Sequence, residues 1–223
     1  MNPAHRDRLA FLRICSGVFE RGMNVTLSRT GKQMKLSQST QLMANERETV
    51  DVAYAGDIIG IYDTGNYQIG DTLTDSKEKL FFEPLPTFPP ELFARVRPVD
   101  TMKAKQFQKG VEQLAQEGAI QVYTNEYNEV ILGAVGQLQF EVIQYRLENE
   151  YNAKCRWEPI SLYKACWIES DDEAQLEAFK KRKYQFMAKD RDGRDVFLAD
   201  SNYVLQMAQS DFEHIKFHFT SEF

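Results

Sequence analysis

The sequence predicts a small all-β barrel followed by an α+β domain. Three observations lead to this prediction: short β-rich segments separated by glycines, a cluster of prolines after residue 83, and an alternation of strand-like and helix-like segments beyond it. The chain has 223 residues, of which 43% are hydrophobic, so it is long enough for two separate cores. We therefore expect a barrel over residues 1–83, a linker over 84–91 and a carboxy-terminal domain over 92–223.

The first region contains only short segments with strand character. Glycines separate these segments at the spacing that is typical of a sandwich or barrel, and no helical periodicity competes with them. The tetrapeptide at residues 29–32, RTGK, is typical of a hairpin tip. The expected β segments are RLAFLRICSG, MNVTLSR, QMKLSQ, ETVDVAYAG, DIIGIYD and QIGDTLT.

The segment EPLPTFPPE holds four of the seven prolines of the chain. Proline fixes φ and removes a backbone donor, so neither a helix nor a central strand continues through such a segment. We interpret it as a linker between two modules.

After the linker, strand and helix patterns alternate. LFARVR is strand-like, and Asp100 or Thr101 can cap a helix that Gly118 ends. AIQVY and EVIL then indicate two strands around a polar turn, and a second helix and the strand-like CRW follow. The order βαββαβ is that of a ferredoxin-like unit, in which two helices cover one face of an antiparallel sheet.

Two rows of apolar residues lie on the second of these helices, so we expect its apolar face to be broad. The first row is Leu138, Val142 and Tyr145, with Asn149, and the second is Phe140, Ile143 and Leu147.

Residues 160–223 indicate a further α+β extension of the same domain. DDEAQLEAFKKRK has acidic residues in its first turn and basic residues in its last, as expected for a helix. DVFLAD and IKFHF are strand-like, and SNYVLQMAQ begins with a serine cap.

The stretch GAVGQLQF, residues 133–140, has two glycines at a strand-to-helix junction, where a phosphate can bind. A P-loop needs a lysine and a Ser or Thr that are absent here, and a dinucleotide fingerprint needs a third glycine. A KH-type loop joins two helices and usually carries basic residues, whereas this one follows VIL. We interpret the glycines as a joint that permits a turn and close packing.

Composition excludes several other classes of protein. The formal charge of −6 argues against a free-standing DNA or RNA binder, and no apolar run is long enough for a membrane span, so we expect a cytoplasmic protein. Of the three histidines, only His214 and His218 have a spacing that could suit a metal, and two ligands do not close a site, so we expect no metal. The three cysteines are scattered, and we expect them to be small buried residues. No nucleophile has a recognisable base partner, so we expect no catalytic residue.

The chain resembles the second and third domains of the bacterial peptide chain release factor three family, which are translational GTPases. Five motifs carry the resemblance in family order, and AGDIIGI with QIGDTL also resembles, more loosely, the barrel of elongation factors Tu and G. GAVGQLQFEV with RLENEY is more specific to the release factor family. The motifs are HRDRLAFLRICSGVFERGM, YAGDIIGIYDTGNYQIGDTL, FPPELFARVRPVD, EGAIQV and ILGAVGQLQFEVIQYRLENEYNA.

The resemblance implies a role in translation termination, with GTP-dependent removal of the decoding release factor from the ribosome. The family's GTPase domain, with its P-loop and NKxD motif, has no counterpart in this sequence. We therefore expect a carboxy-terminal portion of a longer protein, without a cofactor of its own, while GTP and magnesium belong to the GTPase domain. By the same resemblance, the barrel faces small-subunit ribosomal RNA and the second domain approaches ribosomal protein.

Two basic clusters are candidates for contacts with RNA phosphates. Their alternative roles are ordinary solvated charge and, for the second cluster, favourable interaction with a helix dipole. The first cluster is Arg29, Thr30, Lys32 and Lys35 of the predicted hairpin together with Arg47, and the second is Lys180, Lys181, Arg182 and Lys183. A different hypothesis remains open, that of a free-standing enzyme with a site in the groove between the two domains.

Overall fold

The structure is a computed structural model that describes residues 8–36, 39–43, 46–63, 65–82 and 88–220. The chain divides into two compact units, Met1–Leu85 and Pro86–Phe223. Each unit has hydrophobic cores of its own.

The first unit consists of short antiparallel strands. They are β1 (Arg8–Arg13), β2 (Val18–Glu20), β3 (Asn24–Leu27), β4 (Lys32–Lys35), β5 (Ser39–Met43), β6 (Glu46–Thr49), β7 (Val52–Tyr54), β8 (Ile58–Asp63) and β9 (Leu73–Thr74). They form a four-stranded sheet in the order β1-β8-β5-β6, a three-stranded sheet in the order β4-β3-β9, and the pair β2-β7. The prediction of an all-β first region is confirmed, although the described strands do not join into one closed barrel.

The core of this unit lies between the sheets. Ile59 and Ile61 of β8 point inward together with Phe19 of β2 and Val25 of β3, and all four are buried. The hairpin predicted at residues 29–32 connects β3 to β4, and Gly31 takes a φ of +71° there, which is a conformation that favours glycine.

The described part of the second unit contains four α-helices and eight strands. The helices are α1 (Ala104–Gln116), α2 (Gln137–Asn149), α3 (Glu173–Arg182) and α4 (Asn202–Asp211), and the 3₁₀ turns are η1 (Thr101–Lys103) and η2 (Tyr184–Phe186). The strands are β10 (Leu92–Pro98), β11 (Gln121–Asn125), β12 (Val130–Ala134), β13 (Cys155–Ile160), β14 (Lys164–Glu169), β15 (Met187–Asp190), β16 (Asp195–Ala199) and β17 (Lys216–His218).

These strands form one antiparallel sheet in the order β13-β10-β12-β11-β15-β16-β14-β17. Two βαββαβ repeats contribute the strands of this sheet. The first repeat contains β10 to β13 with α1 and α2, and the second contains β14 to β17 with α3 and α4. The strand order of the first repeat, 4-1-3-2, recurs in the second, and the two repeats join where β11 pairs with β15. The predicted ferredoxin-like unit is confirmed, and the predicted extension is a second complete copy of it.

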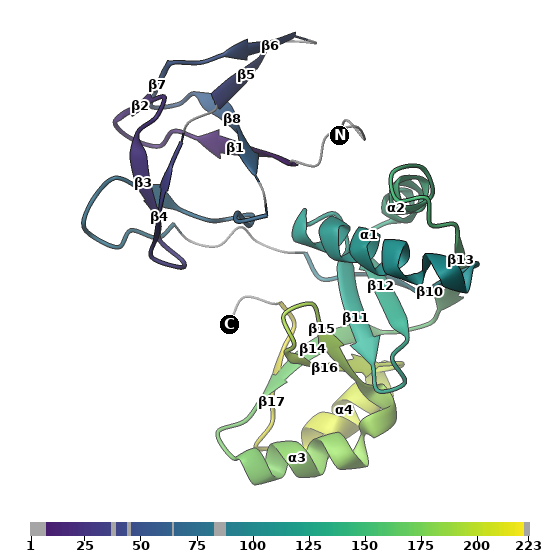
Figure 1. Cartoon of the computed structure of the whole chain (residues 1–223). Helices are drawn as coiled ribbons and strands as arrows, with labels where there is room; N and C mark the ends of the chain where they lie inside the picture. The colour runs from purple at the N-terminus through teal and green to yellow at the C-terminus, as the bar shows by residue number, and fades with distance from the viewer. Residues whose placement is uncertain (1–7, 37–38, 44–45, 64, 83–87, 221–223) are drawn as a thin grey trace. The chain divides into compact units, whose positions relative to one another are not determined.

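The helices cover only one face of the sheet in each repeat. Figure 1 shows α1 and α2 at one end of this unit and α3 and α4 at the opposite end, with the strands between them. Each repeat has one core between its helices and the sheet. The helix-free faces share a further core to which both repeats contribute, including Phe93, Ile131, Trp167 and Val196. Because these side chains are buried without a helix over them, the sheet must bend so that its two helix-free halves pack together.

Two sequence expectations need correction. Strand β15 is not predicted from the sequence, because MAKD is short and its apolar pair is followed by a polar pair instead of alternating with polar residues. The apolar face of α2 is also narrower than expected, since only the row of Phe140, Ile143 and Leu147 is buried.

Candidate nucleic-acid interface

The two glycines of GAVGQLQF have separate structural roles. Gly133 lies in β12, where a Cβ atom would stand 2.8 Å from Cβ of Pro90 and 3.1 Å from Cε2 of Tyr123. The absence of a side chain therefore lets the linker proline pack on the sheet.

Gly136 is the N-cap of α2 and has an extended backbone, with φ −158° and ψ 165°. Gln139 secures this helix start, because its Oε1 accepts a hydrogen bond from the backbone N–H of Val135 at 2.9 Å and its Nε2 donates to the carbonyl of Ala119 at 2.6 Å. This arrangement is similar to a capping box, in which a side chain three residues into the helix reaches back to satisfy a free donor.

The second repeat has the same junction without glycine. Strand β16 ends at Ala199, as β12 ends at Ala134, and two residues later Ser201 caps α4 in an extended conformation, with φ −148° and ψ 159°. Because a serine serves where Gly136 stands, the geometry explains the junction as a joint between strand and helix. That this chain holds no cofactor remains a prediction.

Arg29, the first residue of the predicted RNA-contacting hairpin, makes an intramolecular ion pair. Its Nε donates to Oδ1 of Asp71 at 2.6 Å, and its Nη2 donates to Oδ2 of the same carboxylate at 2.9 Å and to the carbonyl of Asn66 at 3.1 Å. The hydrogen bond to Asp71 raises the pKa of Arg29, against an opposing effect of burial. Arg29 therefore holds the hairpin against the loop at residues 66–71, and its charge is already balanced.

No described carboxylate pairs with the lysines of the hairpin. Lys32 donates from Nζ to the neutral amide Oδ1 of Asn66 at 3.1 Å, and Thr30 accepts from the backbone N–H of Lys32 at 3.3 Å. Lys35 is exposed and has no ion pair among the described residues. Arg47 belongs to β6, but its side chain lies outside the described part of the structure.

The basic end of α3 is largely neutralised. Lys180 lies 2.6 Å from Glu177 and 3.1 Å from Asp195, and the hydrogen bond to Glu177 contributes most to the raised pKa of Lys180, while burial opposes it. Arg182 and Lys183 share the carboxylate of Asp211 at 3.6 and 4.0 Å. Arg182 also lies over the ring of Phe212. Lys181 is exposed and has no ion pair within the described ranges.

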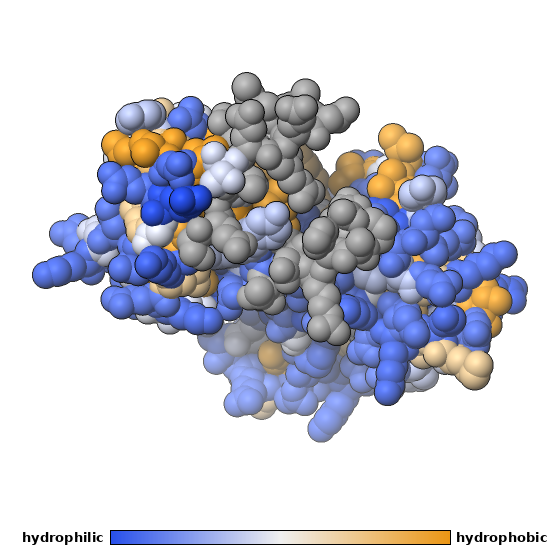
Figure 2. Space-filling view, turned by 45° about the horizontal axis from the view of Figure 1, so that its top comes forward, coloured by the Kyte–Doolittle hydropathy of each residue, from blue (hydrophilic) through white to orange (hydrophobic). Residues whose placement is uncertain are grey.

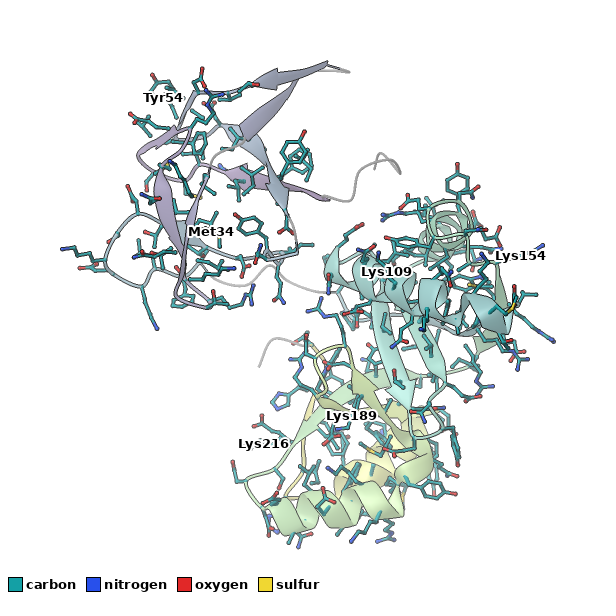
Figure 3. The ribbon with its side chains drawn as sticks, viewed as in Figure 1. Met34, Tyr54, Lys109, Lys154, Lys189 and Lys216 are labelled. Atoms are coloured by element: carbon teal, nitrogen blue, oxygen red, sulfur yellow. The ribbon has the colours of Figure 1, made fainter. Side chains whose placement is uncertain are left out.

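The first repeat carries a further basic group that was not among the predicted contacts. The backbone carbonyl of Lys154 accepts from Val99 at 2.9 Å, which places Lys154 beside the turn that leads into α1. Lys103, Lys105 and Lys109 follow that turn, and none of the four lysines has an ion pair with a described residue; Figure 3 labels Lys109 and Lys154. The sequence signal was the spacing of Lys103, Lys105 and Lys109, whereas the position of Lys154 beside Val99 depends on the fold.

The described residues offer little for other kinds of chemistry. They contain no group of three or more His, Cys, Asp or Glu side chains that could hold a metal ion. Burial raises the pKa of the thiols of Cys155 and Cys166 to about 12, so these cysteines are poor nucleophiles. Cys15, contrary to expectation, is exposed. Within the described ranges, no helix combines the length and apolar character that a membrane crossing needs.

Two family models match this chain. The model described as "Class II release factor RF3, C-terminal domain" matches residues 82–209, and the model described as "Elongation factor G domain 2" matches residues 1–76.

Curated relatives with the name peptide chain release factor 3 are similar over most of the chain. The protein of Listeria monocytogenes serotype 4a (strain HCC23) is 57% identical over 206 residues, and that of Streptococcus mutans serotype c is 56% identical over 206 residues. Each alignment covers 92% of this chain, but only 39% of the Listeria protein and 40% of the Streptococcus protein. The chain therefore spans about two fifths of the length of these relatives.

A crystal structure of a protein from Thermus thermophilus has a similar fold. It superposes with a TM-score of 0.57 at 18% sequence identity, and the match covers 74% of this chain and 26% of that one.

Proposed function

Because this chain belongs to the class II release factor RF3 family through its C-terminal domain, we propose that it is the ribosome-binding portion of a protein that uses GTP to remove the decoding release factor from the ribosome in translation termination. The observation that carries the proposal is the family match over residues 82–209 together with 57% identity to a peptide chain release factor 3.

GTP chemistry belongs to the part of the relatives that this chain does not match. The chain aligns with 39% of the Listeria relative, and its sequence contains neither a P-loop nor an NKxD motif. In this proposal GTP and magnesium act in a separate GTPase domain, which is a partner of the two units described here. The decoding release factor is an indirect partner, and the setting is the cytoplasm, where ribosomes work.

The first unit contacts small-subunit ribosomal RNA through the lysines of the β3–β4 hairpin. Lys32 and Lys35 are the members of the predicted cluster whose charge is not balanced by a described carboxylate, so they can displace counterions from phosphates. Arg29 acts by holding the hairpin in place. The second unit approaches ribosomal protein, and Lys181 is its best-placed cation in the second predicted cluster.

Salt dependence of ribosome binding tests the role of the hairpin. Binding of the chain to bacterial ribosomes is measured by co-sedimentation at several potassium chloride concentrations. The slope of log K against log salt is negative, and each lost phosphate contact reduces its magnitude by about 0.7–0.9. The double variant Lys32→Ala, Lys35→Ala is therefore expected to make the slope less steep by about 1.5.

A matched control removes two lysines that lie beside carboxylates. Lys189 pairs with Asp195 at 2.8 Å and Lys216 with Asp171 at 3.1 Å, and both are labelled in Figure 3. The double variant Lys189→Ala, Lys216→Ala should leave the slope unchanged. Equal slopes for the two double variants would argue against the hairpin as an RNA contact.

A nucleotide titration separates this proposal from a free-standing enzyme. The isolated chain is expected not to bind a fluorescent GTP analogue in a saturable manner. Saturable binding would contradict the assignment of nucleotide chemistry to a separate domain.

A further inference from the structure

Helix α2 has an exposed apolar row on the side that faces away from its core. Leu138, Val142 and Tyr145 are 71, 48 and 67% exposed. Their spacing of four and three residues places them on one face of the helix, so they form a continuous stripe. Figure 2 shows hydrophobic residues at the surface at the upper right, with hydrophilic residues beside them.

A pocket of about 310 Å³ adjoins this helix. Phe140 of α2 and Trp157 of the edge strand β13 line it, and their rings meet edge to face at 5.6 Å. The indole N–H of Trp157 is buried and has no acceptor among the described residues. Among the described strands, β13 pairs only with β10, so the pocket lies at an edge of the sheet.

Three carboxylates lie on α2 or in the pocket beside it. Glu91 and Glu141 line the pocket, and Glu148 lies on α2 one helical turn beyond Gln144, with which it shares a hydrogen bond. None of these three carboxylates has an ion pair with a described residue. The one cation on α2, Arg146, already contacts Glu117 at 2.7 Å and Glu150 at 2.9 Å.

The second repeat has a similar row on α4 but lacks the carboxylate that corresponds to Glu141. Tyr203 and Met207 of α4 stand where Leu138 and Val142 stand in α2, and they are 70 and 39% exposed. At other equivalent positions, Gln206 replaces Glu141 and Ser210 replaces Tyr145, while Glu213 corresponds to Glu148. The second repeat therefore lacks the third residue of the stripe and the carboxylate at the position of Glu141.

We propose that the α2 stripe and the adjoining pocket bind a basic amphipathic helix of a partner protein. Apolar side chains of that helix cover Leu138, Val142 and Tyr145, as in other complexes in which a helix packs on an apolar surface. Lysines or arginines of the same helix approach Glu91, Glu141 and Glu148. The negative charge excludes a nucleic acid at this surface, because phosphates need cations. The inference does not depend on the proposed ribosome function.

A synthetic peptide tests the proposal directly. The probe is a fluorescein-labelled helical peptide of about four turns, with leucines on one face and lysines on the other. Fluorescence anisotropy measures its binding to the whole chain. Two further peptides have glutamates in place of the lysines, or serines in place of the leucines. We expect the basic amphipathic peptide to bind at least about tenfold more tightly than either of them.

Substitutions then place the peptide on α2. The double variant Leu138→Ala, Val142→Ala and the single variant Glu141→Lys should each weaken binding by about tenfold. The control variant Tyr203→Ala, Met207→Ala on α4 should change binding by less than about twofold. All four side chains altered to alanine are solvent-accessible, and circular dichroism with thermal melting checks that each variant is folded.

Two outcomes would overturn the proposal. One is equal binding of the serine-containing basic peptide, which would show only a general attraction to a chain of charge −6. The other is equal loss of binding in the α2 and α4 variants, or no loss in either.

Discussion

The two glycines between β12 and α2 show how single residues distinguish a ligand site from a structural joint. Gly133 and Gly136 look alike in the sequence, yet the first is enclosed by Pro90 and Tyr123 and the second stands in open space. Neither has a positive φ among the described backbone conformations. The joint predicted from the sequence is therefore a packing contact at one glycine and a helix cap at the other.

This difference predicts opposite effects of substitution. Gly133→Ala should lower the free energy of unfolding by about 1–3 kcal/mol, because the new methyl group would overlap the ring of Pro90. Gly136→Ser should leave stability unchanged or raise it by up to about 1 kcal/mol, because serine is a good N-cap and reduces the freedom of the unfolded chain. Urea unfolding measures both. A loss at Gly136 similar to that at Gly133 would show that the second glycine has a role beyond capping.

Charge is also decided residue by residue. Arg29 and Lys32 belong to one predicted cluster, but Arg29 has a carboxylate partner and Lys32 has only a neutral amide. The partner residues, Asp71 and Asn66, are far along the chain, so no local pattern could distinguish the two cations.

At the scale of elements, helix ends were the most predictable feature. Asp100 caps η1 by accepting from the N–H of Met102 at 2.9 Å, directly before α1. Asp172 caps α3 and Ser201 caps α4, and Gly118 follows α1 with a φ of +66°. These features depend on residues within one turn of each other, and the sequence is therefore sufficient to predict them.

The caps predict graded losses of stability. Oδ1 of Asp172 accepts two backbone hydrogen bonds, at 2.9 and 3.2 Å, whereas Oγ of Ser201 accepts one at 3.3 Å. Asp172→Ala should therefore lower the free energy of unfolding by about 1–2 kcal/mol and Ser201→Ala by about 0.5–1 kcal/mol.

Two controls accompany these variants in urea unfolding. Asp172→Asn keeps a capping oxygen and should retain most of the stability. Asp171→Ala removes a neighbouring carboxylate that is exposed and contacts Lys216, and it should change stability by less than about 1 kcal/mol. If Asp171→Ala and Asp172→Ala destabilised equally, local charge rather than capping would explain the loss.

The buried face of helix α2 could not be predicted from its sequence. Its two apolar rows are equally compatible with a core position, since both have helical spacing. Only the packing of α2 against α1 and the sheet buries Phe140, Ile143 and Leu147 and leaves the other row in solvent.

At the scale of the second unit, two repeats share one sheet and one helix-free core. The rings of Phe93 and Tyr123 from the first repeat and of Trp167 from the second follow one another with centroids 6.3 Å apart. In addition, Arg191 after β15 donates to the carbonyl of Ala115 at the end of α1 at 3.3 Å. These contacts predict that the two repeats unfold together.

The two tryptophans of the chain allow a test, because Trp157 lies in the first repeat and Trp167 in the second. In a Trp167→Phe background, Trp157 emission reports the first repeat alone. Phe179→Leu, in the core of the second repeat, should lower the midpoint of urea unfolding that Trp157 reports, by an amount that corresponds to about 1–2 kcal/mol. Tyr203→Ala, on the surface of the same repeat, is the control. An unchanged Trp157 midpoint with Phe179→Leu would show that the repeats unfold independently.

The sequence by itself determined the β-rich first region, the proline-rich segment, the ferredoxin-like order of the first repeat and the helix caps. It could do so because hydrophobic period, proline and glycine geometry and capping act over a few residues. The tertiary structure decided which row of α2 is buried, which cations are neutralised, and that a four-residue strand without alternating polarity, β15, joins a second repeat to the first. These outcomes depend on contacts between residues that are far apart in the chain, where no local pattern carries the information.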